Sequence, residues 1–254
     1  MIDPTRTAIV TGVGKRVGRA IAEALLADGW AVVAHVHHDG DGVPDGAVEV
    51  AADLSEEAAA ATIFAAAKGL PPVELLVNNA ARFADDRLET IDAAGFDSHM
   101  AVNVRAPALL TKEFASRVGD SGGGLVVNLL DAKLSAPNPD FLSYTLSKIA
   151  LAGLTTLSAR ALAGRGIRVN AIAPALMLQS KGQDESNFEV MHRLNPLGRG
   201  VTPADVVAAL RYLIGATAMT GETLTLDGGQ RFWALPRDVQ YLSPSGDGQF
   251  LETK

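Results

Sequence analysis

The sequence predicts an α/β protein in which helices pack against a buried parallel sheet within a single domain. Short apolar runs rich in Val, Ile and Leu alternate with longer segments of helical period, as they do around parallel sheets. Hydrophobic residues make up 48% of the 254 residues and aromatic residues only 5%, which favours this class over a β-sandwich. No internal repeat, linker or change of composition divides the chain, so we expect one domain over residues 1–254.

The beginning of the chain has the pattern that opens a dinucleotide-binding unit. An apolar run from Thr7 leads into the glycine loop TGVGKRVGRA, and a helical segment and a second apolar run follow. Gly12, Gly14 and Gly18 would let a pyrophosphate approach the backbone at the N-terminus of the helix. The spacing is T-G-x-x-x-R-x-G, with Arg16 in the middle, so a plain tight turn remains the alternative.

The end of the second strand bears on the choice of cofactor. Sites that prefer NAD usually place an acidic residue there to bind the ribose hydroxyls. This chain has Val36, followed by His37 and His38, and Lys15 adds a positive charge in the glycine loop. Neutral or basic groups favour a 2′-phosphate and so predict NADPH, although the histidines could simply cap a strand edge. No suitably spaced carboxylate or cysteine accompanies them, so we predict no metal site.

The third and fourth strands are also predicted to end in polar residues. AVEVAADLS ends at Asp53, which could accept a hydrogen bond from an adenine amine or belong to a helix N-cap with Ser55. VELLVNNA ends at Asn78 and Asn79, whose amides can bond neighbouring backbone and hold a cofactor cleft open.

The segment from Val126 to Lys148 is the centre of the predicted site. A buried strand, VVNLL, ends at Asp131, and a loop with two prolines leads into the helix FLSYTLSKIALAGLTTLSARALA. Tyr144 and Lys148 lie four residues apart, so they share one face of this helix. A neighbouring cation should lower the phenol pKa from about 10 and make Tyr144 a better proton donor. A surface Tyr and Lys without function are the alternative for so short a motif.

The other elements follow in order. A helical stretch, GFDSHMAVNVRAPALLTKEFASRV, carries Asn103 in its middle, and Pro107 predicts a kink or a join. GIRVNAIAP is a strand, and about 175–200 lacks a clean period and is typical of a substrate loop. TPADVVAALRYLIG is a capped helix and GETLTLDGG the last strand. The tail, about 231–254, could dock on a neighbouring subunit, lie beside the site or remain on the surface.

Composition excludes several functions. Lys and Arg total 22 against 29 Asp and Glu, a net charge of −7, which argues against general nucleic-acid binding. The lack of cysteine excludes disulfides and thiolate catalysis. No signal-peptide pattern or apolar run of ~18 residues occurs, so we expect no membrane partner and a cytoplasmic location.

Taken in order, the motifs TGVGKRVG, Asp53, NNA, Asn103, YTLSK, RVNAIAP and LDGG closely resemble the short-chain dehydrogenase/reductase family over about residues 5–230. The resemblance implies a Rossmann-type, doubly wound parallel sheet with helices on both faces. It also implies a homo-oligomer, a dimer or tetramer. Asn103, Tyr144 and Lys148 would be catalytic, with Tyr144 the proton donor and Lys148 also holding the nicotinamide ribose.

Three residues depart from the family pattern. Asp131 replaces the usual serine, Arg16 the middle glycine of the first loop, and Ala175 the glycine after Pro174. The first two departures occur together in the pteridine reductases, which NNAARF and HVHH also resemble. There the matching phenylalanine, Phe83, would stack on the pterin.

The predicted function is therefore the NADPH-dependent transfer of a hydride to a pteridine, dihydropteridine or dihydrofolate-type small molecule. The alternatives are a carbonyl reductase or alcohol dehydrogenase of the same family, and a catalytically weak NADPH-binding regulatory protein. The predicted catalytic residues are Asp131, Tyr144, Lys148 and Asn103. The predicted substrate-binding residues are Arg16, Phe83, Asp131 and Tyr144. The predicted residues for binding NADPH or NADP are Gly12, Lys15, Arg16, Val17, Gly18, His37, His38, Asp53, Leu54, Asn78, Ala80, Tyr144, Lys148 and Pro174.

Overall fold

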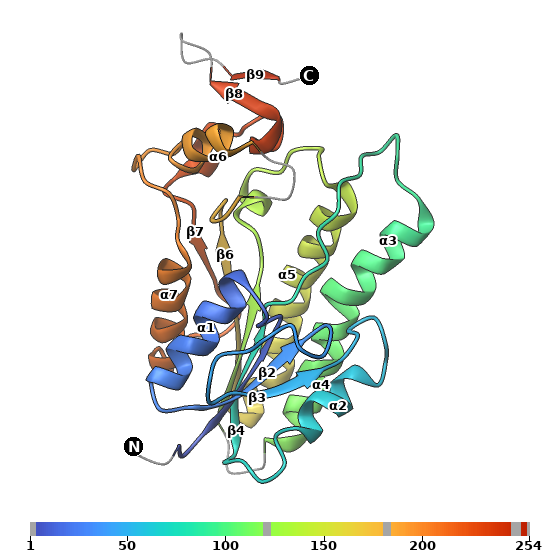
Figure 1. Ribbon diagram of the computed structural model, residues 1–254, viewed down its shortest axis with the longest axis vertical. Helices are drawn as coiled ribbons and strands as arrows, with labels where there is room; N and C mark the ends of the chain where they lie inside the picture. Colours follow the sequence, from blue (N-terminus) through green and yellow to red (C-terminus); the bar gives the residue numbers. More distant parts are fainter. Residues whose placement is uncertain (1–3, 119–122, 180–183, 245–249, 253–254) are drawn as a thin grey trace.

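A seven-stranded parallel sheet forms the centre of the molecule (Figure 1). The computed structural model describes residues 4–118, 123–179, 184–244 and 250–252. The strand order is β3-β2-β1-β4-β5-β6-β7, as expected for a doubly wound Rossmann-type sheet. The strands are β1 (Thr7–Thr11), β2 (Ala31–Val36), β3 (Val48–Ala51), β4 (Val73–Asn78), β5 (Gly124–Leu129), β6 (Ile167–Pro174) and β7 (Thr223–Leu226).

Helices cover both faces of the sheet, and this explains why its central strands are mostly apolar. On one face lie α1 (Arg16–Ala27) and α7 (Pro203–Gly215), and on the other lie α2 (Ala59–Ala65), α4 (Ala106–Arg117) and α5 (Leu142–Leu162). Successive strand residues point to opposite faces, so Val10 joins the core beneath α1 and α7 while Ile9 joins the core beneath α2 and α4. The helix that follows Asp53 in the chain, α2, begins only at Ala59, so Asp53 and Ser55 lie before it.

The long helical stretch around Asn103 is made of three pieces. The helix α3 (Ala93–Met100) passes through a π-helical turn, Ala101–Arg105, into α4, and Pro107 lies in the first turn of α4. The predicted join near Pro107 is therefore confirmed. Pro107 is tolerated there because the first N–H groups of a helix need no intrahelical acceptor.

Two segments close the top of the molecule above the carboxyl ends of β6 and β7 (Figure 1). The predicted substrate loop contains a helix that its sequence pattern did not reveal, α6 (Glu185–His192), capped by the side chain of Asp184. The tail forms an antiparallel pair, β8 (Leu242–Pro244) and β9 (Phe250–Glu252), and α6 packs against β8. In the parts of the chain that the structure describes, no helix combines the length and apolar character needed to cross a membrane.

Candidate active site

A cleft of about 1110 Å³ lies at the carboxyl ends of the strands. The strand order reverses between the neighbouring strands β1 and β4. Such a switch point is where open α/β sheets bind their ligands. Most predicted site residues line it: Gly12, Lys15, Arg16, Val17, Gly18, His37, His38, Asp53, Leu54, Ala80, Phe83, Asp131, Tyr144, Lys148 and Pro174. Asn78 and Asn103 lie outside this lining.

The glycine loop wraps tightly around the start of α1. Gly12 has φ +72°, and a Cβ on Gly18 would lie 2.1 Å from the carbonyl oxygen of Gly12, so a side chain fits at neither position without strain or clash. Arg16 also has a positive φ, +59°, although it carries a side chain. Its guanidinium donates to the carbonyls of Leu178 (3.0 Å) and Gln179 (3.3 Å). Arg16 therefore connects the glycine loop with the substrate loop across the cleft.

The loop fits the pyrophosphate of a dinucleotide. Lys15, the N-cap residue of α1, makes no side-chain cap, so the positive end of the helix remains available to an anion. His35, which no motif marked, holds the loop in place. Its Nδ1 accepts from the Gly12 N–H (3.2 Å) and its Nε2 donates to the Ala52 carbonyl (2.9 Å). Burial lowers the pKa of His35, which keeps the ring neutral and able to accept at Nδ1.

Both basic and acidic side chains lie near the end of β2. His37 and His38 are exposed, and their ring centroids lie 4.1 Å apart. Asp41, which was not predicted, lines the same part of the cleft and accepts from the His38 N–H (3.2 Å). Asp53 lines the cleft and accepts from the Ser55 N–H (2.8 Å). Its alternative interpretation as part of a helix N-cap is wrong, because α2 begins only at Ala59 and Ala58 is its N-cap residue.

Asn78 does not reach the cleft. Its side chain is buried and donates to Asn128 (2.8 Å), which donates to Thr155 on α5 (2.9 Å). Asn79 instead lines the cleft and donates to the Thr11 carbonyl (2.8 Å), so this asparagine joins β4 to the glycine loop. Only one of the two asparagines can face the cleft, because adjacent residues along a strand point in opposite directions.

Three side chains converge where β5 ends and α5 begins. The Tyr144 hydroxyl donates to Oδ2 of Asp131 at 2.9 Å. Oδ1 of Asp131 accepts from the Lys133 N–H (2.8 Å), which keeps the carboxylate in place. Lys148 Nζ donates to the Leu129 carbonyl (2.6 Å) and lies 5.6 Å from the Tyr144 ring centroid. No ion pair between Asp131 and Arg16 or Lys133 is found among the described residues.

The electrostatics of this group differ from the sequence-based expectation. Burial, together with the charge and hydrogen bond of Asp131, raises the pKa of Tyr144 well above its usual value. Burial lowers the pKa of Lys148 to about 8, against the opposing effect of Asp131. The expectation that Lys148 would lower the pKa of Tyr144 is therefore wrong, because burial disfavours the phenolate and the Asp131 carboxylate accepts a hydrogen bond from the phenol. The phenol is protonated at neutral pH.

Asn103 lies in the π-helical turn, a type of irregularity that is frequent at functional sites. Its amide nitrogen donates to the Arg82 carbonyl (2.9 Å) and to Ser147 Oγ (2.8 Å), and its oxygen accepts from the Arg82 N–H (2.7 Å). Ser147 in turn donates to the Tyr144 carbonyl (2.6 Å). Asn103 thus positions the loop after β4 against α5, and its predicted catalytic role stays a prediction.

Phe83 stands at the edge of the cleft beside the phenol. Its ring stacks on Phe141, with centroids 4.4 Å apart, and meets Tyr144 edge-on at 4.8 Å. Phe83 is 47% exposed, so part of its ring remains accessible to a planar substrate.

The tail supplies site residues that no motif marked. Arg237 and Asp238 line the cleft together with Lys133. They come from a segment without a regular pattern, and only the folded chain brings them beside Asp131. Of the three locations considered for the tail, the one beside the site is confirmed for this segment.

The chain belongs to the short-chain dehydrogenase/reductase family of oxidoreductases. The family model described as enoyl-(acyl carrier protein) reductase matches residues 12–231. Pteridine reductase 1 of Leishmania tarentolae is 31% identical over 87% of this chain and 95% of its own length. Galactitol 2-dehydrogenase (L-tagatose-forming) of Cereibacter sphaeroides is 34% identical over 89% and 95%.

Solved structures agree with the fold and with the pteridine reductase-like branch. FolM alternative dihydrofolate reductase 1 from Brucella suis, in complex with NADP, superimposes with a TM-score of 0.84 at 35% identity, covering 91% of this chain and 95% of that one. The Brucella canis protein, also complexed with NADP, gives a TM-score of 0.83 at 36% identity, covering 89% and 94%.

Proposed function

We propose that this chain is an NADPH-dependent reductase of a pteridine, dihydropteridine or dihydrofolate-type substrate. The observation that carries the proposal is the carboxylate of Asp131, hydrogen-bonded to Tyr144 within the cleft. An ionised carboxylate accepts hydrogen bonds and cannot donate them, so it would repel a ketone oxygen. It would pair with the N–H groups of an aminopteridine. The similarity to pteridine reductase 1 and to the FolM proteins supports the same substrate class.

The cofactor assignment rests on the glycine loop, the free end of α1 and the basic groups at the end of β2. The NADP in both Brucella structures supports it. Lys15, His37 and His38 would attract a 2′-phosphate, and each charge-assisted contact is worth about 1.5–3 kcal/mol. We expect NADPH to bind at least about tenfold more tightly than NADH, despite the nearby Asp41.

When bound, the cofactor supplies the hydride that reduces a C=N bond of the ring. Tyr144 gives the proton to the ring nitrogen, because it is the buried donor in the cleft. Asp131 orients the phenol and pairs with substrate N–H groups. Lys148, fixed by the Leu129 carbonyl, directs its ammonium toward the cofactor ribose. Phe83 offers a ring face on which the substrate stacks.

A carbonyl reductase or polyol dehydrogenase is the second candidate, and the similarity to galactitol 2-dehydrogenase favours it. A binding protein without catalysis is less well supported, because binding alone does not require a buried phenol paired with a carboxylate and an amine. The predicted cytoplasmic location stays a prediction.

We also propose a homo-oligomer, dimer or tetramer, assembled through α5. This helix exposes Ile149 (50%) and Leu157 (68%). Light scattering on the purified protein would give its mass in solution.

Asp131→Ser separates the two enzymatic candidates. Serine can still accept from the Lys133 N–H, so the turn should fold, but the charge and its substrate contacts are lost. We expect dihydropterin turnover with NADPH to fall about tenfold or more, since each contact to a charged group contributes about 1.5–3 kcal/mol. Ketone reduction should hold or rise, because serine adds a neutral donor.

The assay compares dihydropterin, dihydrofolate and a panel of ketones and polyols, with Asp131→Asn as the isosteric control. Unchanged pterin reduction in Asp131→Ser, combined with collapse of ketone reduction, would show that the pteridine assignment is wrong. A parent enzyme that turns over only polyols or ketones would show the same.

A further inference from the structure

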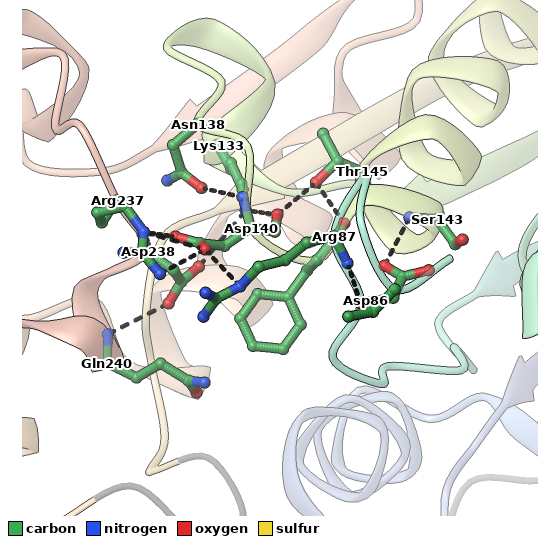
Figure 2. Close-up of polar contacts among 12 residues, drawn as sticks. Asp86, Arg87, Lys133, Asn138, Asp140, Ser143, Thr145, Arg237, Asp238 and Gln240 are labelled. Atoms are coloured by element: carbon green, nitrogen blue, oxygen red, sulfur yellow. Dashed lines mark hydrogen bonds and ion pairs between the residues drawn. The ribbon is translucent and has the colours of Figure 1, made fainter. Parts of the chain in front are cut away.

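The tail is fixed to the rim of the cleft by one buried carboxylate, Asp140, which is only 1% exposed (Figure 2). Arg237 donates to it through Nε (2.8 Å) and Nη2 (2.9 Å), and the Asp238 N–H donates to it at 2.8 Å. Arg87, from the loop after β4, lies 3.3 Å away on the same carboxylate. Segments nearly 100 residues apart in sequence are therefore held together at this point.

This arrangement places the side chain of Asp238 in the cleft. One of its oxygens accepts from the Gln240 N–H (3.2 Å), and the other lies 3.6 Å from Lys133 Nζ. Lys133 is also nearly buried, with 9% of its side chain exposed, and donates to the Asp140 carbonyl. Figure 2 shows Lys133, Asp238 and Arg237 gathered around Asp140.

Asp238 and Asp131 act on the same region. Both negative charges contribute to the raised pKa of Tyr144, and Asp131 contributes, after burial, to the raised pKa of Asp238 itself. Lys133 is held between them by its backbone bond to Asp131 and its side-chain pairing with Asp238. The cleft next to the phenol therefore presents two carboxylates and one ammonium.

We propose that Asp238 is a specificity-determining residue, which binds N–H groups of the substrate ring on the side of the cleft next to Tyr144, with Lys133 as the neighbouring donor to a ring carbonyl. This inference rests on the proposed function and refines its substrate class. A carboxylate beside an ammonium complements an edge that carries both N–H donors and a carbonyl, as a 2-amino-4-oxo ring does. Polyols and simple ketones have no such edge.

In this arrangement Asp140 and Arg237 are positioning residues. The Asp140 carboxylate accepts from the Asp238 N–H and from the Arg237 side chain, and these contacts hold Asp238 at the cleft. The C-terminal tail thereby takes part in substrate selection, while the glycine loop and the start of α1 line another part of the cleft.

Asp238→Asn tests the proposal. Asparagine has the same shape and can still accept from the Gln240 N–H, so folding should be retained, as a melting temperature would verify. We expect the KM for dihydropterin to rise about tenfold to a hundredfold while kcat changes less than about threefold. NADPH affinity, measured by fluorescence titration, should stay within about threefold, because the glycine loop and the start of α1 line another part of the cleft. Asp45→Asn removes the same charge from an exposed loop and serves as the matched control.

A second measurement avoids turnover altogether. Binding of 2,4-diaminopteridine to the enzyme saturated with NADP should weaken in Asp238→Asn and not in Asp45→Asn. Arg237→Ala should weaken it as well, and Arg237→Lys should restore part of the loss. A merely structural role would instead lower pterin, ketone and cofactor binding together.

The outcomes separate the two proposals. If the parent enzyme reduces dihydropterin and Asp238→Asn has the parent KM and the parent affinity for 2,4-diaminopteridine, the role of Asp238 is refuted while the proposed function stands. A parent enzyme that neither reduces nor binds pterins overturns both. Loss of pterin affinity confined to Asp238→Asn and Arg237→Ala supports both.

Discussion

At the residue scale, the chemistry of the site depends on which of three polar side chains, Asp131, Tyr144 and Lys148, contact one another. Sequence spacing pairs Tyr144 with Lys148, yet the structure places Asp131 in direct contact with the phenol. Burial disfavours the ionised form of both side chains. The Tyr144 phenol therefore keeps its proton, whereas the Lys148 ammonium loses its proton more easily than it would in water. The neutral phenol is therefore ready to donate, and the charge of Lys148 is the element that titrates near neutral pH.

Tyr144→Phe should remove turnover and leave NADPH binding largely intact. The hydroxyl gives the transition-state proton, and general-acid catalysis is typically worth ~10²–10⁴-fold in rate. The ring itself keeps its edge contact with Phe83, so the fold should not change. Steady-state kinetics and fluorescence titration with NADPH measure the two effects. A variant that retains a third of the parent kcat would refute this mechanism.

The pH dependence should follow Lys148. Because its pKa is lowered to about 8, the ammonium is present below that pH and is lost above it. We expect kcat/KM for NADPH, which reports the free enzyme, to decline as pH rises from 8 to 9.5. Lys148→Arg keeps its charge throughout, so its residual activity should be independent of pH over this range. A parent profile that stays flat to pH 9.5 would contradict the assignment.

At the scale of single elements, the N-terminal ends of two helices have different roles, one in binding and the other in stability. The start of α1 has no side-chain cap and faces the cleft, whereas the start of α7 is fully satisfied. There Thr202 and Asp205 form a capping box, and Arg199 donates to the Asp205 carboxylate (2.9 Å). These contacts lower the pKa of Asp205 to about 2. A binding helix thus keeps its N–H groups free, and a structural helix does not.

Thr202→Ala should destabilise the protein without affecting the site. Loss of an N-cap costs about 1 kcal/mol, which corresponds to a melting temperature lower by about 2–4 °C in a chain of this size. The contribution of Asp205 is present above its unfolded pKa and is lost as pH falls through about 2, so the deficit should be similar at pH 6 and pH 8. Calorimetry at pH 6 and pH 8 checks this, and Thr202→Ser serves as the conservative control. A melting temperature equal to that of the parent would mean that the cap contributes nothing.

At the scale of the whole molecule, the parallel sheet collects the ends of its strands into one cleft and the tail completes the rim. Asp140 joins the loop before α5 to the tail and to the loop of Arg87. Burial alone would raise the pKa of Asp140, but Arg237, the Asp238 N–H and Arg87 outweigh it, so the pKa is lowered. The Asp140 carboxylate is therefore ionised throughout the physiological pH range, and its contacts with Arg237 and Arg87 persist over that range.

Asp140→Ala should lower stability and weaken substrate binding together. Removing one partner of a buried ion pair costs about 3–5 kcal/mol, and we expect the lower end because Arg87 is partly exposed. At about 2–4 °C per kcal/mol the melting temperature should fall by about 6–12 °C. Asp140→Asn can still accept from the Asp238 N–H and should lose less. Equal stability of Asp140→Ala and the parent would show that the tail is held by other contacts.

The sequence by itself determined the strand order along the chain, the glycine loop, and the proximity of Tyr144 and Lys148. These follow from local rules: apolar period, close approach at Gly18, and four-residue spacing on a helix. The family and the residues around Asp131 were also predictable, because each of the motifs that mark them is a short, continuous stretch of sequence.

Only the tertiary structure decided which of two adjacent asparagines faces the cleft, how the pKa of Tyr144 shifts, and that the tail reaches the site. Asn79 and not Asn78 lines the cleft because the register of β4 sets the direction of each side chain. The phenol pKa depends on burial and on a carboxylate thirteen residues away, neither of which helical spacing encodes. Asp238 reaches the cleft through contacts with Asp140, nearly 100 residues earlier, and pairing over such a distance leaves no local pattern.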